Sequence, residues 1–386
     1  ILITNGRFPA TLDLIRSFAK QGHRVIVAET NQFHYCYSSN ATYKNTTIPS
    51  PRENEQGYIE KILEIIEQEE VDFFLPAWED VLVVSKHLDA FPEGVAFTSD
   101  YKLVHALHNK WEFAHLIESL GFHAPKTLLV KSKEELKTVP FNTFYIKSNY
   151  SRGSEGALFI RNKQKAEKHI KKFPVIVQEK CEGKQYCTYT VCHHGKITAH
   201  VTYPLHYQRY NENKSRGNYC LSFEEVEHQK IYDFVQAFAS KIKYHGSLAF
   251  DIFDDGEKIT ILECNPRLTS GVTLLTPQKT LPDAFFNEVV EPLLPKKGEQ
   301  RQYLMPSIFF ASKTAIKNGS FLPFLRTIFQ SKDIIFRKND IKPFFFQPLI
   351  GAYNLYLKLK YRKSMISSYS HDLDYEEYEE EEKEAL

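Results

Sequence analysis

Blocks of apolar and polar residues divide the chain into two regions with different periodicities. Residues 1–30 read as a strand, a helix and a second strand, because two apolar runs flank apolar residues at helical spacing. Helical blocks and short apolar runs continue to about residue 121, which predicts a parallel sheet covered by helices. Between residues 125 and 265, eight short strand-like runs follow, with helices predicted near 162–172 and 223–243. The pattern therefore predicts an α/β lobe followed by an α+β lobe.

The turn after the first predicted strand lacks the glycines of a dinucleotide site. A G-x-G-x-x-G motif would cradle a pyrophosphate, but only Gly6 stands at this turn. We therefore expect a lobe that is Rossmann-like in shape and binds no dinucleotide. Glu29 ends the second predicted strand, where a ribose-binding acid could stand, and without the glycines a solvated strand end is expected.

Composition and charge narrow the class of protein. The 386 residues are 42% apolar and 25% charged, which is typical of a globular chain. Lys and Arg number 49 against 48 Asp and Glu, so the net charge of +1 argues against a nucleic-acid partner. The start of the chain shows no signal-peptide pattern, and six Cys without a C-x-x-C pair predict reduced thiols in a cytoplasmic protein.

The most specific chemical pattern is a predicted hairpin over residues 247–271. DDGEK reads as its turn, so Asp251 and Glu263 are expected opposite each other on one face, with Asn265 two residues further along. Opposed side chains in a sheet have Cβ atoms roughly 5 Å apart. Carboxylate and amide oxygens are the ligands that Mg²⁺ prefers, and Arg267 adds a cation beside them.

Two further segments place polar groups at strand ends. Residues 144–160 carry Lys147 after an apolar strand, followed by a loop rich in Ser and Gly that could hold a triphosphate. Residues 175–191 carry Gln178 and Glu179 at a strand end, where backbone groups could bind an adenine. By itself, each segment is more simply a strand connection.

Taken together and in this order, the segments resemble the ATP-grasp superfamily. The matching stretches are NKWEFAHLIESLGFHAPKT (109–127), FYIKSNYSRGSEGA (144–157), VQEKCEGKQY (177–186) and AFDIF followed by ILECNPR (249–267). GRFPATLDLIRSFAKQGHRVIVAE and FLPAWED resemble the pre-ATP-grasp domain of carbamoyl-phosphate-synthase-like and purine-pathway members. The resemblance covers about residues 1–290. It implies a pre-ATP-grasp lobe and a two-lobed ATP-grasp fold, which an aromatic-rich helical C-terminal appendage is expected to follow.

The resemblance also implies a role for individual residues. Lys110 and Lys147 would contact the ATP phosphates, and Arg267 would face the transferred phosphoryl group, so that Arg267 and Lys147 would be the catalytic residues. The implied nucleotide-binding set is completed by Ser154 and Gly156 in the closing loop and by Glu179, Cys181 and Gln185 around the adenine and ribose. The implied metal ligands are Asp251, Glu263 and Asn265.

The implied chemistry is a ligase reaction with ATP and Mg²⁺, with two ions expected and Mn²⁺ as an alternative metal. A small-molecule carboxylate would be phosphorylated, and an amine or similar nucleophile would attack the acyl phosphate. A kinase and a degenerate, nucleotide-binding scaffold remain alternatives. Asn109 and Gln185 depart from the Asp and Glu usual in the family, and Asp251 replaces a more common Glu. Arg209, Lys214 and Arg216, in a polar loop, could bind an anionic substrate.

The C-terminal region has segregated charge. Residues 312–363 hold eleven Lys and Arg against two Asp, whereas residues 372–386 hold nine acids and one Lys. The basic, aromatic segment is expected to pack on the enzyme or to contact a membrane peripherally, and Pro343 and Pro348 are expected to break it into short helices. The acidic tail is expected to be disordered and to compete for the same cations.

These patterns predict four parts, which are a pre-ATP-grasp domain (1–105), an ATP-grasp domain (106–290), an appendage (291–370) and an acidic tail (371–386).

Overall fold

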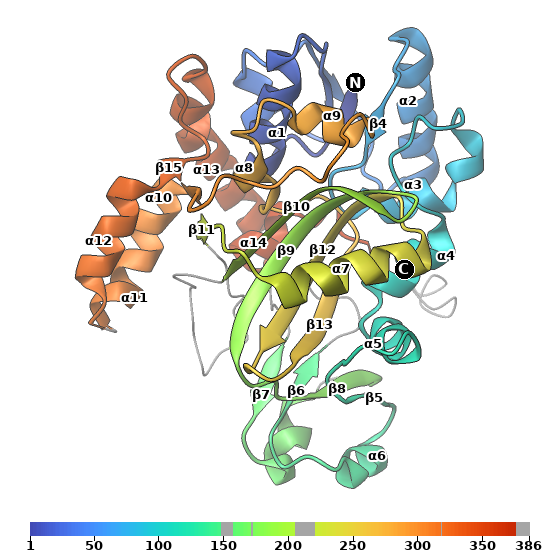
Figure 1. The fold of residues 1–386 in the computed structure, drawn as a ribbon, viewed down its shortest axis with the longest axis vertical. Helices are drawn as coiled ribbons and strands as arrows, with labels where there is room; N and C mark the ends of the chain where they lie inside the picture. The colour runs from blue at the N-terminus through green and yellow to red at the C-terminus, as the bar shows by residue number, and fades with distance from the viewer. Residues whose placement is uncertain (148–156, 171–172, 205–220, 318, 376–386) are drawn as a thin grey trace. The chain divides into compact units, whose positions relative to one another are not determined.

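The computed structural model describes residues 1–147, 157–170, 173–204, 221–317 and 319–375. The chain divides into two compact units (Figure 1). Unit 1 combines Ile1–Val104 with Asp340–Leu386, and unit 2 is His105–Asn339. The residues of the predicted appendage are therefore divided between the units, and the C-terminal residues from Asp340 onward belong with the N-terminal lobe.

Unit 1 is built on a four-stranded parallel sheet in the order β3-β2-β1-β4. Its strands are β1 (Leu2–Thr4), β2 (Ile26–Glu29), β3 (Lys44–Thr47) and β4 (Phe74–Leu75). The helices of its N-terminal part are α1 (Pro9–Lys20), α2 (Glu55–Gln68), α3 (Asp80–Lys86) and two 3-10 helices, η1 (Tyr35–Ser38) and η2 (Leu88–Ala90). The short apolar run near residue 96 forms a single bridge between Ala96 and Phe74.

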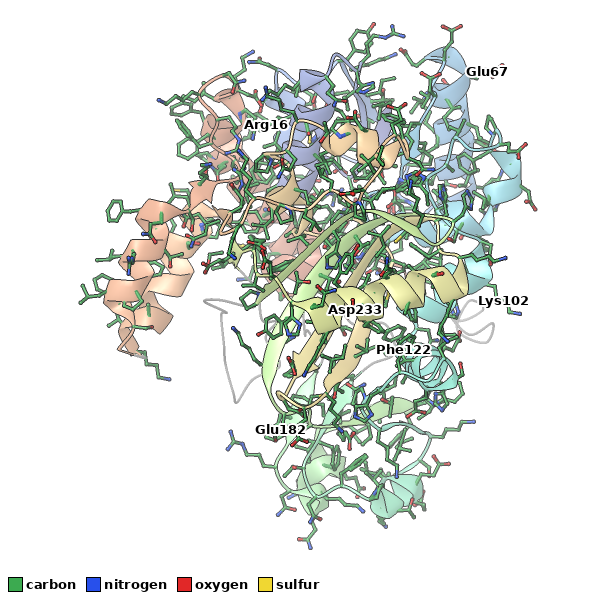
Figure 2. The ribbon with its side chains drawn as sticks, in the orientation of Figure 1. Arg16, Glu67, Lys102, Phe122, Glu182 and Asp233 are labelled. Atoms are coloured by element: carbon green, nitrogen blue, oxygen red, sulfur yellow. The ribbon has the colours of Figure 1, made fainter. Side chains whose placement is uncertain are left out.

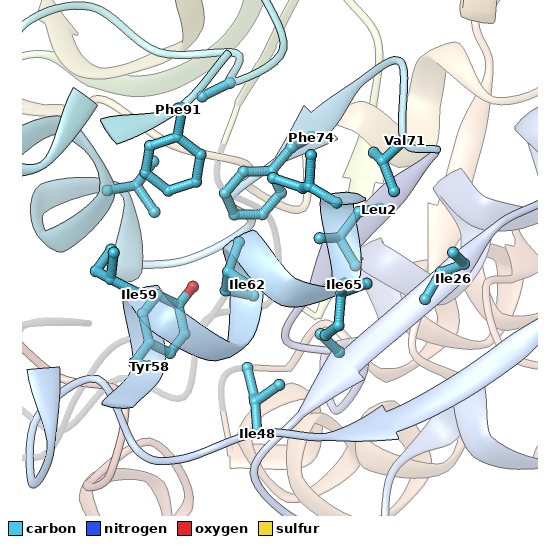
Figure 3. Packing of buried hydrophobic residues seen from close by; sticks show 14 of the residues in the cluster. Leu2, Ile26, Ile48, Tyr58, Ile59, Ile62, Ile65, Val71, Phe74 and Phe91 are labelled. Atoms are coloured by element: carbon cyan, nitrogen blue, oxygen red, sulfur yellow. The ribbon is translucent and has the colours of Figure 1, made fainter. Parts of the chain in front are cut away.

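The core of unit 1 lies between this sheet and α2. Figure 3 shows Tyr58 and Ile62 of α2 packed with Leu2 of β1 and Phe74 of β4, all four at most 1% exposed. Asn54 caps α2 by accepting a hydrogen bond from the backbone N–H of Gly57 at 2.9 Å. The apolar residues of α2 recur at helical spacing and so lie on one face of the helix. That face packs against the sheet.

The C-terminal part of unit 1 consists of α13 (Lys342–Tyr361) and α14 (Met365–Tyr369). The prediction that Pro343 and Pro348 divide this stretch is wrong, because α13 is one helix of 20 residues. Pro343 stands in the first turn, where no N–H is needed. Pro348 leaves the carbonyl of Phe344 without its helical donor, and the Gln347 side-chain amide donates to that carbonyl at 3.0 Å.

Unit 2 contains two antiparallel sheets that follow α4 (Tyr101–His108) and α5 (Lys110–Ser119). The smaller sheet has the order β5-β8-β6-β7, and the larger has the order β10-β9-β12-β13. The smaller sheet consists of β5 (Thr127–Val130), β6 (Phe144–Lys147), β7 (Leu158–Ile160) and β8 (Val175–Glu179), with α6 (Lys133–Thr138) and the 3-10 helix η3 (Lys163–His169). The larger consists of β9 (Lys184–His193), β10 (Lys196–Pro204), β12 (Gly246–Asp254) and β13 (Ile259–Asn265).

An aromatic cluster joins the larger sheet to its helices. Phe234 of α7 (Gln229–Ile242) packs edge-on against Phe250 of β12 at 5.1 Å between ring centroids. Phe113 of α5 stacks on the same ring at 6.2 Å, and Phe122, labelled in Figure 2, packs against Phe234 at 5.0 Å. These rings fix α5 and α7 on the sheet, and α5 carries Lys110 at its first residue.

The remaining elements of unit 2 follow the larger sheet along the chain. They are a third sheet of β11 (Ser222–Glu224), β14 (Gln300–Gln302) and β15 (Lys332–Asp333), with α8 (Val272–Leu275), α9 (Leu281–Phe285), α10 (Leu304–Pro306), the π-helix η4 (Ser307–Ala311), α11 (Ser312–Lys317) and α12 (Phe321–Gln330). Across the described part of the chain, we find no helix that is long and apolar enough to span a membrane.

Candidate active site

A pair of carboxylates stands on adjacent strands of the larger sheet in unit 2. Asp251 of β12 lies directly opposite Glu263 of β13, and Asn265 lies opposite Ala249 two residues further along. A turn centred near Glu257 predicts this pairing, and in the structure a register shift between Asp251 and Ile252 produces it, since Asp254 pairs with Ile259 next to the turn. Because strand side chains alternate between faces, Glu263 and Asn265 share the face of Asp251. Two carboxylates and an amide therefore meet at one place on the sheet.

Nearby cations make the two carboxyl groups of this pair electrostatically unequal. Burial, and then the nearby charge of Glu263, raise the pKa of Asp251 to about 8. Burial alone would also raise the pKa of Glu263, but the charges of Lys110 and Lys147 outweigh it and lower that pKa. The Cys187 thiol donates a hydrogen bond to Asp251 Oδ1 at 2.7 Å. The two carboxylates therefore titrate as a pair, in which Lys110 and Lys147 favour the ionised form of Glu263.

Three buried cations belong to the same part of unit 2. Lys110 is 7% exposed, Lys147 at the end of β6 is 8% exposed, and Arg267 is 8% exposed. Lys147 Nζ donates to Gln178 Oε1 at 2.7 Å, and Arg267 Nη2 donates to Asn265 Oδ1 at 3.2 Å. Cations are rarely buried without anionic partners. Their charges act on Glu263, which is the group they stabilise here.

The segment that joins the two sheets holds the predicted adenine-binding residues. Glu179 ends β8, and its carboxylate accepts from the backbone N–H of Lys126 at 2.8 Å. Cys181 is half-buried, and burial raises the pKa of its thiol to about 11. Gln185 of β9 pairs with Phe253 of β12. Gly183 has φ +103°, and a Cβ there would stand 2.3 Å from the Asp254 carbonyl oxygen, so only glycine fits this turn.

Two predicted groups lie outside the described residues. They are Ser154 and Gly156 of the predicted phosphate loop, and Arg209, Lys214 and Arg216 of the predicted substrate loop.

A comparison with protein families identifies the domain that carries this site. The family model described as an ATP-grasp domain matches residues 107–271. These residues form an ATP-grasp domain. Every predicted site residue of this chain lies within the matched range, and the fold around them is that of the two sheets described above.

Relatives and solved structures extend this finding. The chain is 20% identical over 229 residues to the arginine-specific carbamoyl phosphate synthase large chain of Bacillus subtilis (strain 168); the match covers 56% of this chain and spans 22% of that protein. Phosphoribosylamine–glycine ligase of Thermotoga maritima has a TM-score of 0.60 at 16% identity, with 78% of each chain covered. N5-carboxyaminoimidazole synthetase of Staphylococcus aureus complexed with ADP has a TM-score of 0.60 at 13% identity, covering 78% of this chain and 80% of that one. TM-scores of 0.60 at identities this low show a shared fold and no more than that.

The ATP-grasp domain offers a ligand set that suits Mg²⁺. Among the residues described, no group of three or more His, Cys, Asp and Glu side chains could hold a metal ion. The available set is two carboxylates and the Asn265 amide, all of them hard oxygen ligands. A divalent cation would offset the burial and the charge of Glu263, which together raise the pKa of Asp251. Such a set leaves coordination positions for phosphate oxygens and water, as Mg²⁺ sites in nucleotide-binding enzymes do.

Two residues of this site have functions that sequence reasoning missed. Gln178 links Lys147 to the Thr127 hydroxyl, to which its amide donates at 3.0 Å, and it is 1% exposed. Its polar side chain in the apolar run VIVQE was the available signal. Asn109 separates α4 from α5. Its side chain accepts from the N–H groups of Trp111 and Glu112, each at 3.1 Å, and so starts the helix that carries Lys110.

Proposed function

We propose that this chain is an ATP- and Mg²⁺-dependent ligase that activates a carboxylate as an acyl phosphate. The observation that supports it is a half-buried carboxylate pair, Asp251 and Glu263, influenced by the cations Lys110 and Lys147 inside an ATP-grasp domain. A carboxylate is a poor electrophile because its carbon carries no good leaving group. Transfer of the γ-phosphoryl group to a carboxylate oxygen supplies phosphate as that leaving group and releases ADP. An amine or similar nucleophile then attacks the carbonyl carbon, and phosphate departs.

Each residue has a proposed part in this reaction. Asp251, Glu263 and Asn265 would hold Mg²⁺, which offsets phosphate charge when bound. Lys110 and Lys147 would bind the ATP phosphates, and Arg267 would stabilise charge on the moving phosphoryl group. Glu179, Cys181 and Gln185 would line the base and the ribose, Cys181 through its backbone.

A screen of carboxylate and amine pairs for ADP release tests this function. Hydroxylamine is added to trap an acyl phosphate as a hydroxamate. A ligase gives carboxylate-dependent ADP release and a hydroxamate. A kinase gives ADP and a stable phosphorylated product without hydroxamate. Nucleotide binding without ADP release under any pair favours the scaffold function instead.

Lys147→Ala should weaken ATP binding itself, since the proposed phosphate contact is made before any reaction. The variant loses the proposed ion pair between Lys147 and an ATP phosphate, so Kd should rise at least tenfold. A tenfold rise corresponds to about 1.4 kcal/mol of binding free energy. The measurement is a calorimetric titration with ATP and Mg²⁺. Lys137→Ala, which changes an exposed lysine of α6, is the matched control and should leave Kd unchanged. Equal affinities of wild type and Lys147→Ala would remove Lys147 from the site.

We also propose that α13 contacts anionic lipid surfaces peripherally. One face of α13 packs within unit 1, where Tyr353 lies against Phe33 at 4.8 Å between ring centroids. The opposite face exposes an apolar stripe at helical spacing, and α13 contains no Asp or Glu. The stripe consists of Phe345 (69% exposed), Leu349 (45%), Tyr356 (55%) and Leu359 (70%). Exposed Lys342, Lys358 and Lys360 give this helix the charge that anionic headgroups attract.

Binding to vesicles of phosphatidylserine and phosphatidylcholine tests this contact. Phe345→Asp combined with Leu359→Asp should abolish co-sedimentation at low salt, whereas Leu322→Asp, on the exposed side of α12, should not. A chain ended after residue 375 should bind more strongly, since the removed residues hold seven acids and one Lys. Deletion from residue 372 would be unsuitable because Asp372 and Asp374 belong to unit 1. Equal sedimentation of all chains contradicts the contact.

A further inference from the structure

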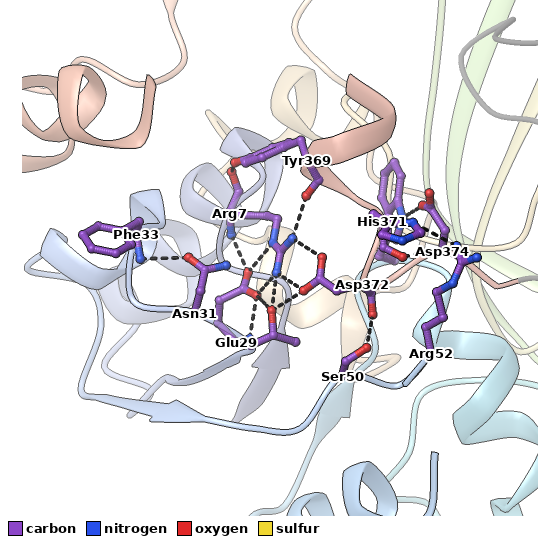
Figure 4. A network of polar contacts seen from close by, with 12 residues as sticks. Arg7, Glu29, Asn31, Phe33, Ser50, Arg52, Tyr369, His371, Asp372 and Asp374 are labelled. Carbon is purple, nitrogen blue, oxygen red and sulfur yellow. Dashed lines mark hydrogen bonds and ion pairs between the residues drawn. The ribbon is translucent and has the colours of Figure 1, made fainter. Parts of the chain in front are cut away.

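Residues 369–375 lie against the loops that follow the strands of the unit 1 sheet (Figure 4). The first five residues of the predicted disordered tail, 371–375, are thus described and packed, and residues 376–386 lie outside the described part. Ser50, beyond β3, donates its hydroxyl to the Asp372 carbonyl at 2.6 Å. Beyond β4, Glu79 Oε2 accepts from the backbone N–H of Tyr375 at 2.9 Å. The segment is therefore held by loops from separate strands.

The centre of these contacts is Arg7, which follows β1 and is 1% exposed. Asp372 binds it with both carboxylate oxygens, Oδ1 to Nη1 at 2.7 Å and Oδ2 to Nη2 at 2.8 Å. Thr30 donates its hydroxyl to the same Asp372 carboxylate. The arrangement is the paired, planar recognition by which arginine selects a carboxylate.

Arg7 has a second partner that belongs to the sheet itself. Glu29 at the end of β2 accepts from Arg7 Nε at 3.1 Å and from the Arg7 backbone N–H at 3.0 Å. The expectation of a solvated strand end at Glu29 is therefore wrong, since its side chain is 1% exposed. Arg7 and Glu29 are 22 positions apart in sequence, so no local pattern relates them. Without Asp372, Glu29 would still neutralise Arg7 and hold it in place. Nη1 would keep its hydrogen bond to the Tyr369 carbonyl at 2.6 Å, and the Nη1 and Nη2 donors that face Asp372 would be available to another acid.

The position of Arg7 in the sheet is one where ligands are expected. The order β3-β2-β1-β4 reverses between β1 and β4, and ligands of open parallel sheets bind at such a reversal beyond the carboxyl ends of the strands. Arg7 follows β1, and Trp78 follows β4, where its indole N–H donates to Asp374 at 3.4 Å. The chain's own residues 372–374 bridge these two loops. A buried ion cluster is weak evidence for stability alone, since apolar residues of equal volume serve as well.

We propose that Arg7 and Thr30 form a binding site for the carboxylate of a small-molecule ligand, and that Asp372 occupies this site as an internal substitute. The inference goes beyond the proposed ligase function, because none of these residues belongs to the ATP-grasp domain. A carboxylate ligand would take the Nη1 and Nη2 donors and the Thr30 hydroxyl in exchange for Asp372. Residues 369–375 would then leave the loops, so binding of the ligand and seating of this segment exclude each other.

Formate is the probe for the first test, because it has the shape of the group that Asp372→Ala removes. The full-length variant is unfolded thermally in increasing sodium formate, with sodium chloride at equal ionic strength as reference. A saturable rise in Tm is expected, with a half-saturating concentration at least tenfold lower than for wild type. Asp374→Ala is the matched control, since it removes a carboxylate of the same segment that binds an indole N–H rather than Arg7. Its Tm should respond to formate as that of wild type does.

Asp372→Asn keeps the shape of the side chain and serves if the alanine variant does not fold. It should lose affinity for Arg7 and show faster deuterium uptake at the amides of residues 373–375. In the wild-type chain, acetate should accelerate the same amides while β1 and β2 stay unchanged. The proposed site is overturned if formate does not raise the Tm of Asp372→Ala. It is also overturned if formate raises the Tm of Asp374→Ala with the same half-saturating concentration as that of Asp372→Ala. Unaltered uptake at residues 373–375 in saturating acetate overturns the exchange.

Discussion

Glu263→Gln should abolish ATP-dependent turnover while the chain remains folded. The substitution removes the carboxylate that Lys110 and Lys147 stabilise, at nearly constant volume, so packing on β13 is kept. Without that charge, the proposed metal site loses an anionic ligand, and Lys110 and Lys147 lose the group on which their charges act. Loss of such electrostatic stabilisation typically lowers kcat by about 10²-fold or more. The measurement is the rate of ADP release with the best carboxylate and amine pair.

Glu257→Gln is the matched control for this experiment. Glu257 is exposed in the turn between β12 and β13, so the same chemical change occurs on the same hairpin without touching the pair. Its rate should stay within twofold of wild type. Circular dichroism and thermal unfolding establish that both variants are folded. A rate for Glu263→Gln within threefold of wild type would mean that the metal site lies elsewhere.

The carboxylate pair could be predicted because it depends on local geometry. A short turn fixes the register of an antiparallel hairpin, and strand side chains alternate with a period of two. Counting outward from a turn centred on Glu257 places Asp251 opposite Glu263. The structure has that pairing, but it depends on an irregularity between Asp251 and Ile252, because the strands nearest the turn pair Asp254 with Ile259. Lys110 and Lys147 are different, because their approach to Glu263 depends on how α5 and β6 pack. Only the resemblance to a known family joined them to the pair.

Unit 1 shows where local patterns stop being informative. Arg7 and Asp372 are separated by 365 positions, and no periodicity relates them. The run of acids from residue 372 onward has the composition of a solvated tail, yet its first residues bind a buried arginine. Pro348 is likewise unfavourable inside a helix, because proline has no N–H to donate. The Gln347 side-chain amide replaces the missing hydrogen bond to the Phe344 carbonyl. In each case a specific partner overrides the compositional tendency.

Arg7→Leu should lower the free energy of unfolding of unit 1 by about 3–5 kcal/mol, the usual effect of removing one partner from a buried ion pair. Burial alone would lower the pKa of Arg7, but Glu29 and Asp372 hold it well above its ordinary value, so the guanidinium is charged. Its removal leaves Glu29 buried without a cation, at a side chain 1% exposed. Leucine fills similar space, so cavity formation contributes little. Urea unfolding followed by tryptophan fluorescence measures the change, since Trp78 lies in unit 1.

Two companion variants separate charge burial from packing in this experiment. Arg7→Leu combined with Glu29→Leu should regain part of the loss, because only Asp372 then remains charged, and its side chain, at 17% exposed, is the most accessible of the three. Lys44→Met breaks the pair with Glu69, in which the lysine is 48% exposed, and should change the unfolding midpoint little. A loss below about 1 kcal/mol for Arg7→Leu, comparable to an exposed pair, would mean that water reaches Glu29. If the double variant is less stable to urea than Arg7→Leu alone, the loss in Arg7→Leu does not come from leaving Glu29 buried without a cation.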